Sequence, residues 1–211
     1  MQKKTALIVG ASGLVGRQLL HLILEDDFYQ SVTSLGRKQL DINHPKLKQE
    51  IVDFENPDLS KISADHIFCT LGTTIKKAGS QDNFKKVDYQ YPFETAKAGL
   101  NNGSELFAIV TAMGSDPKSM FFYNRVKGEV ELSLKELNYH HLGIFRPSML
   151  LGDRQESRLG EQIGQWVMKA IGFLIPANFK AIEAKKVANA MLKYAKSPKK
   201  GLSEISSGQM L

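Results

Sequence analysis

The amino-acid sequence predicts an α/β protein with a doubly wound parallel sheet, the Rossmann architecture, and a small C-terminal helical extension. Short apolar segments alternate with segments of helical periodicity, which is typical of a parallel sheet covered by helices on both faces. The first apolar segment leads through a glycine-rich loop into an amphipathic segment, as in nucleotide-binding domains of this class. A length of 211 residues suits one domain. We therefore expect residues 1–211 to form a single NAD(P)-binding domain, in which residues 147–211 contribute a small substrate-side lobe.

Six segments are predicted to be strands, because each is short and apolar and most of them end near a glycine or a proline. They cover residues 5–9, 31–35, 48–54, 65–71, 106–112 and 141–145. The link between the second and third strands contains Pro45 and is too short for a full crossover helix. We expect no complete helix there.

Five segments are predicted to be helices, near residues 14–24, 80–99, 116–137, 159–171 and 183–196. The first carries a broad apolar stripe at helical spacing. In the second, Pro92 should break or bend the helix. The third is expected to begin with Asp116 as its N-cap and Pro117 at its first position. A short tail is expected after the last helix.

The composition is that of an ordinary globular protein. Apolar residues make up 42% and charged residues 24%, which excludes a disordered, collagen-like or coiled-coil chain. The 28 Lys and Arg against 22 Asp and Glu give a net charge of +6, which suits anions from phosphorylated small molecules to nucleic acid. The lysine pairs are scattered, and no recognised nucleic-acid-binding module is present. We therefore interpret them as solvated surface and expect no nucleic-acid partner.

Cysteine usage and hydropathy give expectations about metals and location. The single cysteine, Cys69, excludes an internal disulfide and is expected to be buried and inert. His66 and Cys69 are three apart on a predicted strand and point to opposite faces, so no metal site is expected. No segment resembles a signal peptide or approaches the roughly 18 apolar residues of a membrane span. We expect a soluble cytoplasmic protein without a membrane partner, and the sequence leaves the oligomeric state open.

A glycine-rich loop joins the first predicted strand to the first predicted helix, with the sequence Gly10-Ala11-Ser12-Gly13-Leu14-Val15-Gly16. Its G-x-x-G-x-x-G spacing is a variant of the dinucleotide-binding loop. A tight turn favours glycine at Gly10, close approach of a pyrophosphate favours it at Gly13, and helix–strand packing favours it at Gly16. The free N–H groups at the helix start then bind phosphate. The loop's position favours cofactor binding over a plain structural turn.

The residues after the second predicted strand indicate which dinucleotide binds. Arg37 and Lys38 follow Gly36, where a carboxylate would hold the ribose 2′-hydroxyl of NAD(H). Two cations suit a 2′-phosphate, so we expect NADP(H); the alternative is a pair of solvated side chains. Asp53, at the end of the third strand, is placed to accept a hydrogen bond from the adenine amino group. Gly72 would let the backbone lie against the adenosine ribose.

Tyr123 and Lys127 are the candidate catalytic pair, because their spacing of four puts them on one face of a helix. A nearby ammonium favours the phenolate and makes Tyr123 usable as a general acid or base. The spacing alone is weak evidence for catalysis. The location of the pair, on the helix after the fifth predicted strand of a dinucleotide-binding fold, strengthens it. A third residue should bind the substrate oxygen. Thr111 and Ser115 are both candidates; Ser115 is alternatively a cap for the following helix.

These features together resemble the short-chain dehydrogenases/reductases. The finer resemblance is to the atypical branch that contains the HIV Tat-interactive protein 2 oxidoreductases and their bacterial relatives. It covers roughly residues 5–160, through the blocks GASGLVGRQLL, LGRK, VDFE, LGTTIKKAGS, YNRVKGEVE and FRPSMLLGDRQESR. Two positions depart from the wider superfamily: Thr111 stands where a serine is usual, and Asp88 stands near a usual asparagine.

The resemblance implies an NADPH-binding Rossmann domain with Tyr123 and Lys127 in the active-site positions. It also implies cofactor contacts at Ser12, Gly13, Leu14, Val15, Arg37, Lys38, Leu71, Gly72, Leu150 and Arg158. Without it, the segment that contains Arg158 would be interpreted as a charged, solvated turn. We expect an NADPH-dependent oxidoreductase acting on an unidentified carbonyl or alcohol. The alternative is a non-catalytic NADPH-binding regulator that acts through a protein partner.

Overall fold

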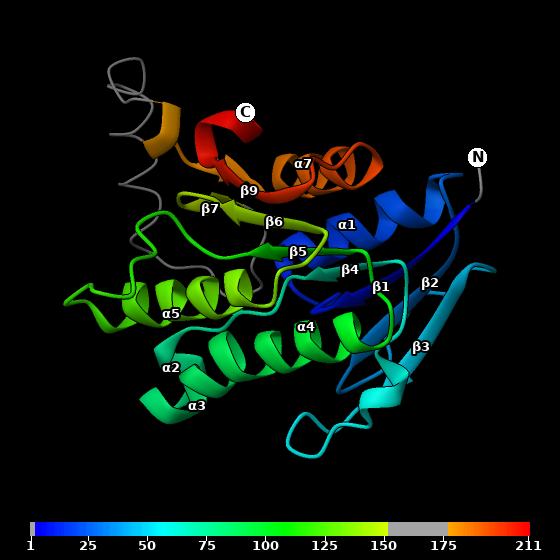
Figure 1. Cartoon of the computed structure of the whole chain (residues 1–211), viewed down its shortest axis with the longest axis horizontal. Helices are drawn as coiled ribbons and strands as arrows, with labels where there is room; N and C mark the ends of the chain where they lie inside the picture. Colours follow the sequence, from blue (N-terminus) through cyan, green and yellow to red (C-terminus); the bar gives the residue numbers. More distant parts are fainter. Residues whose placement is uncertain (1–2, 152–176) are drawn as a thin grey trace.

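A seven-stranded sheet, in which every pair of neighbouring strands is parallel, forms the centre of the molecule (Figure 1). The computed structural model describes residues 3–151 and 177–211. The strand order is β3-β2-β1-β4-β5-β6-β9, so the chain moves outward from β1 in one direction and then in the other. This order confirms the predicted doubly wound Rossmann fold.

The six predicted strands are all present, with ends shifted by a few residues. They are β1 (Lys4–Val9), β2 (Tyr29–Gly36), β3 (Leu47–Ile51), β4 (His66–Cys69), β5 (Leu106–Val110) and β6 (His141–Arg146). The seventh, β9 (Gly201–Ser206), replaces the expected short tail and pairs with β6 from His141↔Gly201 onward. Because β9 is an edge strand with Leu202 47% exposed, it lacks the apolar run that marked the other strands.

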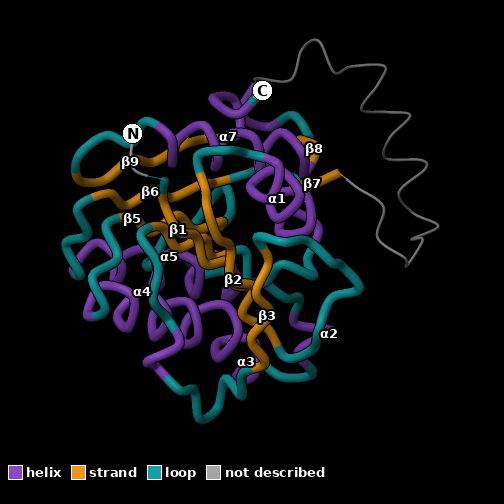
Figure 2. The backbone as a smooth tube through the Cα atoms, turned by 90° about the vertical axis from the view of Figure 1, so that its right-hand side faces the viewer, coloured by secondary structure: helices purple, strands orange, loops and turns teal. Residues whose placement is uncertain are grey.

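Helices cover both faces of the sheet, as Figure 2 shows from the side. The helices α1 (Leu14–Glu25) and α7 (Ala184–Lys196) pack together on one face, and α4 (Tyr91–Asn101) and α5 (Phe122–Glu136) cover the other. Successive residues of β1 alternate between the two cores: Ala6 and Ile8 face the α1 side, and Leu7 and Val9 face the α4 side. Both faces of the sheet are therefore buried.

The helical segment around Pro92 continues through the proline instead of breaking. It runs from α3 (Gln81–Lys85) through one π-helical turn (Lys86–Gln90) into α4. The Tyr91 N–H donates to the Lys86 carbonyl, five residues back, and this wide turn makes room for the proline ring. A short helix, α2 (Ile75–Ala78), precedes α3 and was not predicted.

The helix that carries Tyr123 and Lys127 begins later than predicted. Its N-cap is Phe121, and Asp116 instead closes a turn by accepting the Lys118 N–H at 2.9 Å. This turn packs tightly on α5, since a Cβ at Gly128 would lie 2.2 Å from the Asp116 carbonyl carbon. The Asp-Pro pair is therefore a turn signal here rather than a helix start.

The C-terminal segment contributes to both the sheet and the site edge. The short strands β7 (Leu150–Leu151) and β8 (Ile182–Glu183) form a parallel pair, and α7 and β9 complete the main fold. Part of the segment 147–211, expected as a substrate-side lobe, therefore belongs to the Rossmann layers. The helix predicted near 159–171 lies outside the described residues. Short 3₁₀ turns cover Leu59–Lys61, Ala177–Phe179 and Ser207–Met210.

A buried hydrogen bond links Tyr29 to His66 across the sheet. The Tyr29 hydroxyl lies 2.9 Å from His66 Nδ1, and His66 is only 3% exposed. Burial, together with the nearby charge of Lys4, lowers the pKa of His66 to about 4. The folded protein therefore keeps this imidazole neutral at pH values where the unfolded chain protonates it.

We expect the free energy of unfolding to fall by about 2 kcal/mol between about pH 7.5 and about pH 5 because of His66 alone. The pKa is lower in the folded state, so the unfolded chain binds the extra proton and stability rises with pH across this window. Urea unfolding of His66→Gln should show a smaller pH dependence, whereas the exposed His21→Gln should behave like the wild type. Equal slopes for wild type and His66→Gln would contradict this account.

Candidate active site

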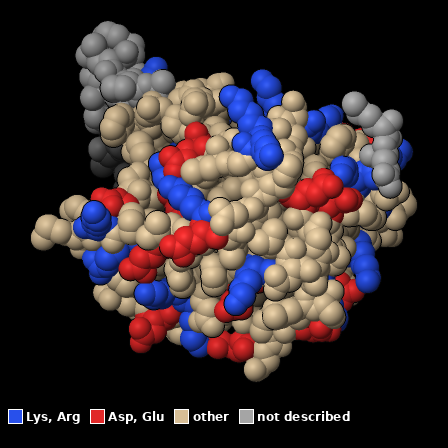
Figure 3. All heavy atoms as spheres, viewed as in Figure 1, with Lys and Arg blue, Asp and Glu red and all other residues tan. Residues whose placement is uncertain are grey.

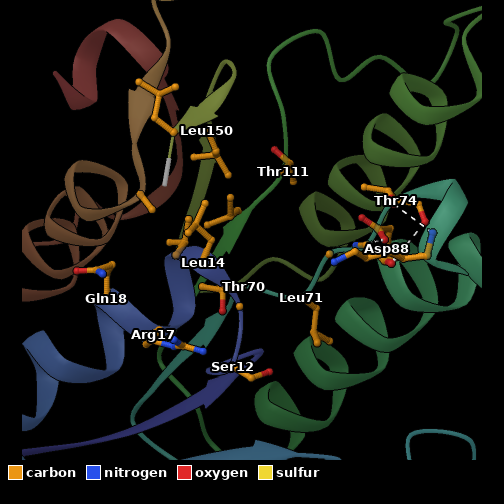
Figure 4. A pocket seen from close by; sticks show the side chains of 18 of the residues that line it. Ser12, Leu14, Arg17, Gln18, Thr70, Leu71, Thr74, Asp88, Thr111 and Leu150 are labelled. Carbon is orange, nitrogen blue, oxygen red and sulfur yellow. Dashed lines mark hydrogen bonds between the residues drawn. The ribbon is translucent and has the colours of Figure 1, made fainter. Parts of the chain in front are cut away.

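The carboxyl ends of β1, β4 and β5 open onto a cavity of about 940 Å³. In an open parallel sheet, ligands bind at this edge, where the strand order reverses. Figure 4 shows Arg17 and Gln18 on one side of the cavity and Leu71 and Asp88 on the other. Its lining comes from segments that are far apart in the sequence: Ser12, Gly13, Leu14, Val15, Arg17, Gln18, Thr70, Leu71, Gly72, Thr73, Thr74, Lys77, Asp88, Val110, Thr111, Tyr123, Lys127, Leu150, Leu151, Glu183, Ala184 and Lys185.

The glycine loop owes its shape to close backbone contacts. Gly10 has a φ of +88°, and a Cβ there would lie 2.7 Å from the Thr70 carbonyl carbon. A Cβ at Gly16 would lie 2.2 Å from the Gly10 oxygen. Neither Gly10 nor Gly16 lines the cavity, whereas Ser12, Gly13 and Leu14 do. The first and third glycines therefore determine the shape of the loop, and the residues between them form the part of the loop that faces the cavity.

The first turn of α1 fits an anionic group. Gly13 is the N-cap, no side chain caps the helix, and its first turn contains no acidic residue. Leu14 and Val15, the first residues of the helix, line the cavity. The N–H groups at a helix start have no partner within the helix and carry a partial positive charge. The helix start at the predicted pyrophosphate position therefore offers N–H donors and carries no acidic side chain of its own.

The predicted specificity residues lie at the edge of the site. Arg37 and Lys38 are exposed at the end of β2, and within the described residues neither side chain forms an ion pair or a hydrogen bond. Asp53 lies two residues beyond β3, not at its end, and its carboxylate accepts the Glu55 N–H at 3.0 Å. The structure places none of these three side chains in the cavity, and their contacts with a cofactor stay predictions.

The predicted catalytic pair lies in the cavity together with Asp88. Lys127 Nζ is 2.8 Å from Asp88 Oδ1, and the two side chains are only 5% and 0% exposed. The other Asp88 oxygen accepts the Thr73 N–H at 2.9 Å. Tyr123 is 37% exposed, and its ring packs against Phe84 at 5.6 Å. The tyrosine is therefore accessible to a ligand, whereas its lysine is held below the surface by a carboxylate.

The charge on Lys127 depends on this pairing. Burial acts to lower the pKa of the ammonium, but Asp88 and Tyr123 outweigh it, and the pKa lies above the ordinary value. Asp88 sits in the π-helical turn, a feature often found at functional sites. Asp88, which stands near a position where the wider superfamily usually has an asparagine, thus places a carboxylate next to Lys127.

The candidates for the third catalytic residue both have their hydroxyls engaged elsewhere. Thr111 lines the cavity, but its hydroxyl donates to Glu131 Oε1 at 2.6 Å. Glu131 is buried and also accepts hydrogen bonds from Arg146 at 3.1 Å. Ser115 donates to the Ala112 carbonyl at 2.7 Å, lies outside the cavity lining and does not cap α5. The Thr111 hydroxyl can donate a hydrogen bond to a substrate oxygen only if it gives up its hydrogen bond to Glu131.

Several lining residues were not found by sequence reasoning. Thr70, Thr73 and Thr74 lie between β4 and α2, and Lys77 lies in α2. Their place after the carboxyl end of a parallel strand is a signal that could have indicated them. Glu183 and Lys185 reach the cavity only because β8 pairs with β7, which the sequence did not predict. Arg158, implied by the resemblance, lies outside the described residues. Leu71, Gly72 and Leu150, also implied by it, do line the cavity.

Cys69 is buried beside the site and takes no part in it. Burial raises the pKa of its thiol to about 12.

The fold and the site define a Rossmann protein with a cavity at the carboxyl edge of its parallel sheet. The chain belongs to the HIM1 family, whose sequence model matches residues 26–171. It is 38% identical over 214 residues to rat protein HTATIP2, covering 97% of this chain and 86% of that protein. It is 34% identical over 205 residues to the mitochondrial protein FMP52 of Candida albicans, covering 90% of this chain and 87% of that protein.

Solved structures confirm the fold class. A UDP-N-acetylglucosamine 4-epimerase from Methanobrevibacter ruminantium matches with a TM-score of 0.74 and 17% identity, over 98% of this chain and 77% of its own. A short-chain dehydrogenase family protein from Francisella tularensis matches with a TM-score of 0.66 and 16% identity, over 99% of both chains. The enzyme WbmH from Bordetella bronchiseptica, solved with NAD⁺, has a TM-score of 0.73 and 16% identity, over 98% of this chain and 76% of its own.

The expectation of a cytoplasmic protein is wrong. The FMP52 proteins of Candida albicans, Debaryomyces hansenii and Candida glabrata, all 34–35% identical to this chain, are named mitochondrial. The expectation used the absence of a signal peptide and of a long apolar segment, and neither absence distinguishes one compartment from another. In residues 3–151 and 177–211, no helix is long and apolar enough to cross a membrane.

Replacing Asp88 by Asn should destabilise the protein by about 3–5 kcal/mol, because it leaves the Lys127 ammonium buried without a counter-charge. The Asp88→Asn/Lys127→Met double variant should lose less than the sum of the two single variants. Urea unfolding measures all three. A matched control is Glu129→Gln, which breaks the more exposed pair with Lys85 and should cost less than about 1 kcal/mol. Strict additivity would show that the two groups do not interact.

Proposed function

We propose that this protein is an NADP(H)-dependent oxidoreductase that acts on a carbonyl or an alcohol. One observation carries the proposal: the exposed Tyr123 and the buried Lys127–Asp88 pair share a cavity with the uncapped first turn of α1. A group that handles protons and a cradle for a pyrophosphate therefore face the same space. A neighbour in fold is described as a short-chain dehydrogenase family protein, which supports this class of activity and leaves the substrate unidentified.

In this proposal, each residue of the pair has a separate task. Tyr123 transfers a proton to or from the substrate oxygen, because its ring is open to the cavity. Lys127 stays charged through Asp88 and places an ammonium in the same cavity as the Tyr123 hydroxyl. A bound nicotinamide would supply a hydride to a carbonyl or accept one from an alcohol. The glycine loop and α1 then serve to orient the two reactants.

The choice of NADP(H) rests on the charge at the end of β2. Arg37 and Lys38 are exposed and unpaired within the described residues, so binding a 2′-phosphate would break no existing ion pair. Charge-assisted hydrogen bonds to a phosphate are among the stronger polar contacts in proteins. The solved neighbour WbmH was crystallised with NAD⁺, so the likeness in fold does not favour NADP(H).

A second candidate function is that of an NADPH-binding regulator that acts through a protein partner. The engaged hydroxyls of Thr111 and Ser115 favour it, because neither donates into the cavity. A reductase commonly uses more than one hydrogen-bond donor to stabilise the charge that develops on the substrate oxygen. Here the Tyr123 hydroxyl would be the one donor of the three candidates that is open to the cavity. Turnover therefore separates the two candidates.

Replacing Tyr123 by Phe should abolish NADPH oxidation by any carbonyl that the wild type reduces, because it removes the proton donor. Affinity for NADPH should stay within about twofold, since the loss of one hydroxyl leaves the phosphate contacts intact. Absorbance of NADPH measures turnover over a broad panel of carbonyls. Tyr194→Phe, outside the cavity lining, is the control and should keep full activity. Absence of turnover in the wild type, with NADPH-dependent capture of a protein, would favour the regulator.

Replacing both Arg37 and Lys38 by Ala should remove most of a preference for NADPH over NADH. We expect that preference to be roughly 10- to 100-fold, from about 1.4–2.8 kcal/mol for the two cations in a half-open site. NADPH should bind more weakly to the variant and NADH about equally, because only NADPH carries the 2′-phosphate. Fluorescence titration of both nucleotides tests this. Equal wild-type affinities for NADH and NADPH would show that the two cations are solvated surface.

A further inference from the structure

The loop between β5 and α5 carries an exposed apolar tip. Met120 is 94% exposed and Phe121 is 75% exposed, the two highest values among the large apolar side chains that the structure describes. Neither residue lines the cavity. In Figure 1 this loop, in green, projects at the left beyond the start of α5, and Figure 3, in the same view, shows residues other than Lys, Arg, Asp and Glu projecting there. Exposed large apolar side chains that lie together often mark a site that binds a protein or a membrane.

The tip is held in place by the loop beneath it. The Asp116 N–H donates to the Asn124 carbonyl at 3.1 Å, and the Phe121 N–H donates to Ser119 Oγ at 3.2 Å. The Arg125 guanidinium donates to the Ser119 carbonyl at 2.9 Å. These bonds tie both ends of the tip to α5. The apolar side chains are therefore presented by an ordered backbone.

Cations flank the tip. Lys118 precedes it by two residues and is exposed, and Arg125 lies directly beneath it, with one guanidinium nitrogen 3.3 Å from the Met120 carbonyl. The nearest acid on the loop, Asp116, accepts the Lys118 N–H, which fixes its carboxylate within the turn. Two cations and one carboxylate therefore lie around the tip, in a chain with a net charge of +6.

The shape and size of the tip decide between possible partners. A stable protein interface buries roughly 800 Å² on each side, and two side chains on a convex loop supply only a small part of that. A lipid surface needs no complementary shape. Apolar side chains inserted between headgroups, with cations at headgroup level, are the usual means by which a folded protein binds an anionic membrane surface.

We propose that residues 118–121 dock the protein onto an anionic lipid surface, with Met120 and Phe121 inserted and Lys118 at the headgroups. This reverses the sequence-based expectation of no membrane partner and concerns surface binding only. Further exposed apolar side chains lie at the same edge of the sheet, with Met113 37% and Met149 58% exposed. The Met113 N–H donates to the Pro147 carbonyl, which ties these two loops together.

Flotation of the full-length protein with vesicles tests the proposal. The wild type should float with vesicles of equal parts phosphatidylcholine and phosphatidylglycerol, and less with phosphatidylcholine alone. Met120→Ser/Phe121→Ser should lower the partition coefficient at least about tenfold. Lys118→Gln should lower it about fivefold. Leu132→Ser is the matched control, because Leu132 is 50% exposed on α5 and should leave binding unchanged.

A second measurement reports insertion directly. Cys69 is buried, so Met120→Cys adds an accessible thiol that takes an environment-sensitive fluorophore. Its emission should shift to the blue with anionic vesicles, and a label at Leu132→Cys should not. Absence of flotation by the wild type, or unchanged binding of the Met120→Ser/Phe121→Ser variant with native thermal unfolding, would overturn the proposal. So would a wild-type dimer in ultracentrifugation that this variant makes monomeric, because the tip would then be covered by a second copy.

Discussion

The arrangement of the site depends on the buried ion pair between Lys127 and Asp88. Both side chains are removed from water, and burying two charges costs several kcal/mol per ion before their attraction returns any of it. Three separate elements meet to make the pair tolerable: α5 provides the lysine, the π-helical turn provides the carboxylate, and the chain after β4 donates the Thr73 N–H. A fold selected for stability alone would gain from an apolar pair here. The retained charges therefore indicate a requirement of the site.

A second buried carboxylate, Glu131, lies one turn further along α5 and has a different task. Its partners are Thr111 on the chain after β5 and Arg146 at the end of β6, so it holds the helix to the two strands. Its hydrogen bonds to Arg146 raise the pKa of that guanidinium despite the opposing effect of burial. Asp88 thus keeps Lys127 in its charged form, whereas Glu131 holds the helix α5, which carries Lys127, against the sheet. The engaged Thr111 hydroxyl is a consequence of this second role.

The sequence predicts what depends on local pattern and misses what depends on distant contacts. The glycine loop and the six predicted strands, five inner strands and the edge strand β3, follow from short apolar segments and from residues without a Cβ, and the structure contains them all. The edge strand β9 escapes prediction because half of it faces water. Asp116 and Pro117 mimic a helix start, and only the close approach of Gly128 shows that they form a turn. The spacing of Tyr123 and Lys127 is local, whereas the partner of Thr111 is twenty residues away and across an interface.

A parallel sheet places all its active-site loops and its exposed tip at one edge. The chain after β1 is where we propose that the phosphates of a cofactor bind. The chain after β4 borders Asp88, and the loop after β5 carries Met120 and Phe121 before it enters the helix of Tyr123. Because each strand runs in the same direction, a surface that contacts the loop after β5 also lies near the mouth of the cavity. Docking through the tip would therefore present the cavity mouth close to the lipid surface.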